Sequence, residues 1–64
     1  MTVREILRLL RKDGWQVVRQ RGSHRQLHHA RKPGTVTVAG KPSRTLHPKV
    51  VASILRQAQL TEDA

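Results

Sequence analysis

The sequence has 64 residues, and its 13 Lys and Arg residues against 4 Asp and Glu residues give a net charge of +9 at pH 7. A chain of this length, residues 1–64, is expected to form one domain with a small core. The absence of cysteine excludes disulfides and thiolate metal sites and fits a cytoplasmic protein. No apolar run approaches the roughly 20 residues that span a membrane. The charge favours nucleic acid or an acidic protein as the partner.

The first predicted element is an amphipathic helix that begins after Thr2 and ends before Gly14. Thr2 and Glu5 have the spacing of a capping box, in which each side chain accepts a hydrogen bond from the other residue's backbone N–H. Apolar residues at helical spacing predict one buried face, made of Val3, Ile6, Leu7 and Leu10. A second face carries Arg4, Arg8 and Arg11. For this arginine stripe we favour a solvated surface over a contact with RNA or a partner.

Strand-like alternation follows over residues 15–21, 24–30 and 35–39. Gly22-Ser23 predicts a type II′ hairpin turn between the first two strands, because the first central position of that turn requires a positive φ. Pro33-Gly34 predicts a type II turn between the second and third strands. The three strands are therefore expected to form one antiparallel sheet.

The two turns predict a register in which Arg21 pairs with His24 and Lys32 pairs with Thr35. One face of the sheet is then apolar and carries Val18, Leu27, Val36 and Val38. The other face is polar and basic and carries Arg19, Arg21, His24, Gln26, His28, Thr35 and Thr37. An antiparallel sheet with this asymmetry is expected to be covered by helices on its apolar face only.

Trp15 and Val17 do not fit this alternation, since both fall on the polar face in the predicted register. Either they pack over the end of the sheet, or a bulge shifts the first strand. In both cases Trp15 is expected to cover the core rather than to stack on a base.

A second helix is predicted from Pro48 to about Ala58, since proline suits the first helical turn. Its apolar residues again have helical spacing, at Val51, Ile54, Leu55 and Ala58. The predicted fold is therefore α+β with the order α-β-β-β-α, in which two helices lie on one face of a three-stranded antiparallel sheet. The acidic tail at Glu62-Asp63 is expected to be frayed.

The candidate chemistry lies between positions 19 and 25, where one histidine stands among three arginines. An imidazole can take and give a proton near neutral pH, and guanidinium groups can hold a phosphate beside it. RNA supplies its own nucleophile, the 2′-hydroxyl, so proton transfer and charge stabilisation suffice to cleave it. We assign proton transfer to His24 and phosphate binding to Arg19, Arg21 and Arg25, with Ser23 as a lesser donor. Arg25 is the weakest of these candidates because it falls on the apolar face in the predicted register.

The other candidates are assigned binding or structural roles. His28 shares a face with His24, but four strand residues separate them by roughly 13 Å, too far for both to act on one phosphate. His28 is therefore a candidate for RNA binding, and His29, on the apolar side, for a hydrogen-bonded position at the core edge. Lys41 and Arg44, in the loop before the second helix, can face RNA, a protein partner or solvent. The few scattered carboxylates argue against a metal site, and no cofactor is expected.

Five segments in order carry a family resemblance: Gly14-Trp15, residues 18–24, Leu27-His28-His29, Val36-Thr37-Val38 and residues 53–58. They resemble the HicA-type toxins, the mRNA interferases of HicA–HicB toxin–antitoxin pairs. The resemblance implies a fold like the double-stranded-RNA-binding domain, ribonuclease activity that arrests translation, catalysis by His24, and neutralisation by a HicB-type antitoxin. The sequence departs from the family pattern at positions 49–52, usually Gly-Thr-Leu-Arg, and at position 59, usually Gly. Both departures bear on the ends of the second helix.

The leading functional prediction is a metal-independent ribonuclease that cleaves mRNA with a single histidine. It is expected to be a monomer alone and a hetero-oligomer with its antitoxin, which would cover the basic sheet face around His24. A non-catalytic double-stranded-RNA-binding module is the alternative, since such modules read RNA shape through phosphate and 2′-OH contacts. A third possibility is a basic protein that only binds an acidic partner.

Overall fold

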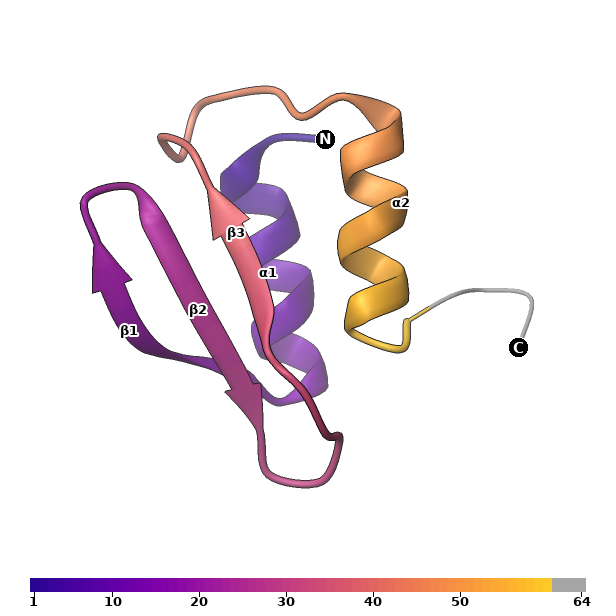
Figure 1. Cartoon of the computed structure of the whole chain (residues 1–64). Helices are drawn as coiled ribbons and strands as arrows, with labels where there is room; N and C mark the ends of the chain where they lie inside the picture. The colour runs from indigo at the N-terminus through magenta and orange to yellow at the C-terminus, as the bar shows by residue number, and fades with distance from the viewer. Residues whose placement is uncertain (61–64) are drawn as a thin grey trace.

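The structure is a computed structural model that describes residues 1–60, so the tail at Glu62-Asp63 lies outside the described residues. The strands form one antiparallel sheet in the order β1-β2-β3. Both helices pack against the sheet (Figure 1), and helices and sheet share one hydrophobic core. The elements are α1 (Val3–Asp13), β1 (Trp15–Arg21), β2 (His24–His29), β3 (Val36–Ala39) and α2 (Pro48–Gln57). This confirms the predicted α-β-β-β-α order, with the predicted ends displaced by at most one residue.

Helix α1 begins and ends as its sequence predicts. The Glu5 N–H donates to Thr2 Oγ1 at 3.2 Å, and the Thr2 N–H donates to Glu5 Oε1 at 2.7 Å, which completes the capping box. At the other end Gly14 adopts a φ of 110°, and its N–H donates to the carbonyl oxygen of Arg11 at 3.0 Å. The predicted apolar face is buried, with Val3, Ile6, Leu7 and Leu10 in the core.

Replacing Thr2 with alanine is expected to lower the free energy of unfolding by about 1 kcal/mol, because the Glu5 N–H loses its acceptor. Hydrogen bonds from the Thr2 backbone and then from its side chain lower the pKa of the Glu5 carboxyl. The stabilisation from this carboxylate is therefore present above its unfolded-state pKa and is lost as the pH falls through the lowered folded-state pKa. Urea unfolding at neutral and acid pH measures both effects. Ser43→Ala, in an exposed loop, is the control and should change neither.

Strand β1 contains a bulge that the alternating pattern left open. The pairing with β2 shifts between Val17 and Arg19, so Val18 is the extra residue and its side chain is 55% exposed. The prediction that Val18 lies on the apolar face was therefore wrong. The shift places Val17 opposite Leu27 and turns Trp15 into the core, where it is fully buried. Of the two alternatives, the bulge is the one that the structure adopts.

The second hairpin has a different register from the predicted one. Leu27 pairs with Val36, whereas a turn that pairs Lys32 with Thr35 would place Leu27 opposite Gly40. Strands β2 and β3 are joined by residues 30–35 rather than by a two-residue turn. Because side chains alternate with a period of two, this shift of four positions leaves every side chain of β3 on its predicted face.

Helix α2 is capped by a histidine whose position the sequence did not predict. The ring nitrogen Nδ1 of His47 accepts the Lys49 N–H at 3.0 Å, and Pro48 follows as the first helical residue. After the helix, Gln59 adopts a φ of 56°, a left-handed conformation, at the position where the family resemblance predicts glycine. A residue with a Cβ is less suited to this conformation than glycine.

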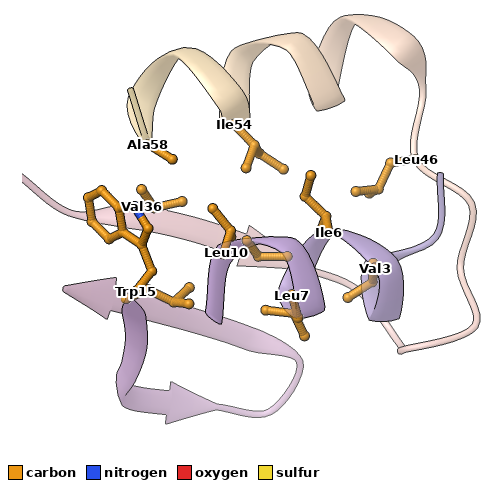
Figure 2. Packing of buried hydrophobic residues seen from close by; sticks show 11 residues of the cluster. Val3, Ile6, Leu7, Leu10, Trp15, Val36, Leu46, Ile54 and Ala58 are labelled. Carbon is orange, nitrogen blue, oxygen red and sulfur yellow. The ribbon is translucent and has the colours of Figure 1, made fainter. Parts of the chain in front are cut away.

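Trp15 is the largest fully buried side chain, and it lies at one end of the core (Figure 2). Within the described residues its indole Nε1 has no hydrogen-bond partner, so its contribution is apolar packing. This confirms Trp15 as a core residue rather than a stacking platform. Neither helix within residues 1–60 has the length and apolar character needed to cross a membrane. The core residues are Val3, Ile6, Leu7, Leu10, Trp15, Leu27, Val36, Val38, Leu46, Ile54 and Ala58.

Candidate functional site

A groove of about 440 Å³ hollows the polar face of the sheet, on the side away from the core. All three strands contribute to it, and every lining residue belongs to the face predicted to be polar and basic. These residues are Arg19, Arg21, His24, Gln26 and Thr37. The structure thus brings together three of the predicted site residues, one histidine and two arginines.

Cross-strand pairing positions these side chains. Arg21 lies directly opposite His24 across the β1–β2 turn, and Arg19 lies opposite Gln26 one step further along the same face. Residues opposite each other on one face have Cβ atoms about 4.5–5.5 Å apart. His24 is exposed, and no hydrogen bond within residues 1–60 engages its ring. Its imidazole is therefore accessible to a bound molecule.

The turn that presents His24 is held by hydrogen bonds from two directions. The carbonyl oxygen of Ser23 accepts the Gly40 N–H at 3.1 Å and Arg25 Nη1 at 3.2 Å. Arg25 Nη1 also donates to the carbonyl oxygen of Gly40 at 3.0 Å. On the other side of the turn, Gln20 Nε2 donates to the carbonyl oxygen of Gly22 at 3.0 Å. The tip of the hairpin is therefore fastened to the end of β3.

Arg25 was predicted to bind phosphate beside His24, but it does not line the groove. Its side chain is only 7% exposed and lies on the apolar side of the sheet, away from the groove. In place of the predicted phosphate contact it makes two hydrogen bonds to backbone carbonyl groups. Arg25 thus holds in place the turn that carries His24.

The remaining predicted site residues do not line the groove. Ser23 is half-buried in the turn, and Lys41 is exposed in the loop that follows β3. His28 is exposed, and its Nε2 lies 3.1 Å from Thr35 Oγ1. Gln26 and Thr37 line the groove although no site role was predicted for them. The alternation that placed both on the polar face was the signal that could have identified them.

His29 occupies the predicted place at the edge of the core. Its Nδ1 accepts the backbone N–H groups of Arg31 at 2.9 Å and Lys32 at 3.1 Å, so the ring proton lies on Nε2. That nitrogen donates to the carbonyl oxygen of Asp13 at 2.7 Å. The ring also packs edge-on against Trp15, with centroids 5.3 Å apart. These contacts join α1, β1 and β2, and they give His29 a structural role.

The charge of the groove has no acidic counterpart in the described part of the chain. The ion pairs found within residues 1–60 all involve Asp13, which pairs with Lys32 at 2.6 Å and approaches His29 at 3.8 Å, at the far end of β2. Arg19 and Arg21 are therefore left to create a positive potential that attracts phosphate. Histidine and acidic side chains of the described residues form no cluster of three or more that could hold a metal ion.

Comparison with known families identifies the family to which the chain is similar. The model of the family described as the HicA toxin of bacterial toxin–antitoxin systems matches residues 3–60. The match spans both helices and all three strands, and it includes every residue that lines the groove. Among curated proteins, no match to the chain was found.

Proposed function

Since the chain belongs to the family of HicA toxins, and is therefore a toxin with an antitoxin partner, we propose that it is an mRNA interferase. In this proposal residues 1–64 act as one domain in the cytoplasm, as an endoribonuclease that needs no metal and that arrests translation by cleaving mRNA. The observation that carries the proposal is the unengaged imidazole of His24 in a groove with Arg19 and Arg21.

The groove contains the groups that RNA cleavage requires. In the proposed reaction His24 takes the proton from a 2′-hydroxyl, whose oxygen attacks the adjacent phosphorus atom. Arg19 and Arg21 donate hydrogen bonds to the phosphate oxygens, where negative charge accumulates in the transition state. The bond to the 5′-oxygen then breaks, and that oxygen takes a proton from water or from the protonated imidazole. The products are a 2′,3′-cyclic phosphate and a 5′-hydroxyl.

We propose that the antitoxin covers this same groove. The groove arginines have no carboxylate partner within residues 1–60, so an acidic face on a HicB-type antitoxin would complement them. Covering the groove also excludes RNA from His24, which explains neutralisation without any change in the fold. The toxin is then a monomer alone and part of a hetero-oligomer with the antitoxin. A complex in which His24 remains accessible to solvent would contradict this arrangement.

A 2′-deoxy substitution tests the chemistry directly. An RNA oligonucleotide with deoxyribose on the 5′ side of each cleaved linkage is expected to resist the purified toxin, because the attacking hydroxyl is absent. The all-ribose control should be cleaved in the presence of EDTA and yield cyclic phosphate ends, as measured by mass spectrometry. Cleavage of the deoxy-substituted strand, or products with a 3′-hydroxyl and a 5′-phosphate, would rule out this mechanism. Binding of RNA with no cleavage of either strand would indicate a non-catalytic RNA-binding module.

A further inference from the structure

A second basic surface begins beside the turn that carries His24. The Gly40 N–H donates to the carbonyl oxygen of Ser23 at 3.1 Å, so the end of β3 lies against this turn. The chain then enters the loop of residues 41–44, where Lys41 and Arg44 are both exposed. Two basic side chains, Lys41 and Arg44, therefore follow the end of β3, which is hydrogen-bonded to the turn that carries His24.

The loop is in turn fastened to the first turn of α1. The Val3 N–H donates to the carbonyl oxygen of Arg44 at 2.9 Å, and the Arg4 N–H donates to that of Pro42 at 2.9 Å. Within the loop, the Arg44 N–H donates to the carbonyl oxygen of Lys41 at 2.9 Å. The backbone beneath these cations is therefore held in place.

Helix α1 continues the series of cations. Arg4 and Arg8 are exposed and four residues apart, a spacing that places them on one face of the helix. We call Lys41, Arg44, Arg4 and Arg8 the basic track. It leads from the turn at His24 over residues 41–44 and onto α1.

The four positive side chains of the basic track outnumber the acidic charge beside them, which is that of Glu5. None of its four side chains forms an ion pair there. Glu5 is the nearest acidic residue in sequence, and its Oε1 accepts the Thr2 N–H at 2.7 Å, in the capping box. Arg4 and Arg8, two members of the arginine stripe that the sequence presented as a solvated face, thus belong to a longer series of basic side chains that form no ion pair within residues 1–60.

We propose that the basic track binds the phosphate backbone of the RNA strand outside the scissile linkage. Lysine and arginine are the residues that bind phosphate backbones without reading sequence. The track contributes no aromatic or large aliphatic side chain, which a protein partner would use as an anchor. RNA backbone is therefore the ligand that its chemistry fits. The proposal rests on the proposed function only for the position of the cleaved linkage, which lies in the groove.

RNA affinity at different salt concentrations tests the track without relying on cleavage. The track variant carries Arg4→Ala, Arg8→Ala, Lys41→Ala and Arg44→Ala, and the control variant removes the same charge with Lys12→Ala, Arg31→Ala, Lys49→Ala and Arg56→Ala. All eight positions are exposed. Both variants are made in a His24→Ala background, and circular dichroism verifies that each is folded. Fluorescence anisotropy then measures binding to a long single-stranded RNA and to a dinucleotide.

The track variant is expected to bind the long RNA at least about tenfold more weakly at low salt. Its slope of log affinity against log salt should be shallower by about 0.7 per lost contact, or roughly 3 for four contacts. The dinucleotide has a single phosphate. Because that phosphate is expected to occupy the groove and not the basic track, both variants should bind the dinucleotide with the same affinity. Equal losses in the two variants, or no loss in the track variant, would overturn the proposal. If the track variant keeps its RNA affinity but loses binding to the antitoxin, the track belongs to a protein partner. That result would also overturn the proposal.

This experiment separates the two proposals. If the wild-type protein binds RNA but cleaves none, the proposed function fails while the salt slopes still decide whether the track binds phosphate. If the wild-type protein cleaves RNA and the slopes of the two variants agree, the track fails and the ribonuclease assignment is unaffected.

Discussion

Replacing His24 with alanine is expected to reduce the rate of RNA cleavage by about 10²- to 10⁴-fold, the usual contribution of one acid–base group. RNA affinity should change little, because Arg19 and Arg21 remain in the groove. Stability should also be unaffected, since His24 is exposed and no hydrogen bond within residues 1–60 engages its ring. Single-turnover cleavage of a labelled RNA measures the rate, and anisotropy measures the affinity.

His28→Ala is the matched control for this substitution. It removes a second exposed histidine from the same face of β2, where the ring bonds to Thr35 rather than lining the groove. This substitution is expected to raise KM and to leave kcat close to that of the wild type. In cells without antitoxin, wild-type expression should stop growth and deplete intact mRNA, whereas His24→Ala should do neither. Transcript loss at the wild-type rate in the absence of His24 would remove the basis of the mechanism.

Replacing Gly14 with alanine is expected to lower the free energy of unfolding by roughly 2–4 kcal/mol, from left-handed strain and a lost hydrogen bond. The backbone at Gly14 has a φ of 110°, and an added Cβ would lie 2.7 Å from Nε2 of His29. The ring would have to leave the carbonyl oxygen of Asp13, which accepts its proton at 2.7 Å. A domain of this length has a total stability of roughly 3–10 kcal/mol, so a large part of it is at risk.

Gly34→Ala separates backbone strain from the steric clash. Gly34 also has a positive φ, of 90°, but an added Cβ would meet nothing within 4 Å. This control should lose only the strain, about 1–2 kcal/mol. Urea unfolding measures both losses, and the histidine ring signals in NMR report whether His29 has moved. Equal losses in the two variants would show that the contact between Gly14 and His29 contributes nothing to stability.

The sequence was a sufficient guide wherever the determining interactions are local. The capping box of Thr2 and Glu5 involves groups three residues apart, so the start of α1 could be predicted. Alternation along the strands assigned His24, Arg19 and Arg21 to one polar face, and the structure brings all three into one groove. This assignment tolerated a wrong register for β3, because the error was an even number of positions.

Local patterns did not determine the bulge at Val18. A bulge leaves one residue out of the ladder, and what favours it here is the burial of Trp15, a side chain that the unbulged register would place on the polar face. The register of β3 likewise depends on Val36 and Val38 reaching the core, and the two-residue turn suggested by Pro33-Gly34 gives way to a longer loop.

By itself, therefore, the sequence determined the order of elements, the limits of α1, and which side chains share the face that carries His24. The tertiary structure alone decided which carbonyl groups the buried Arg25 reaches and that residues 41–44 lie against α1. The physical reason is the range of the interactions. Caps, turns and alternation act between near neighbours in the chain, whereas a buried guanidinium needs carbonyl groups that only folding brings to it, one of them fifteen residues away at Gly40.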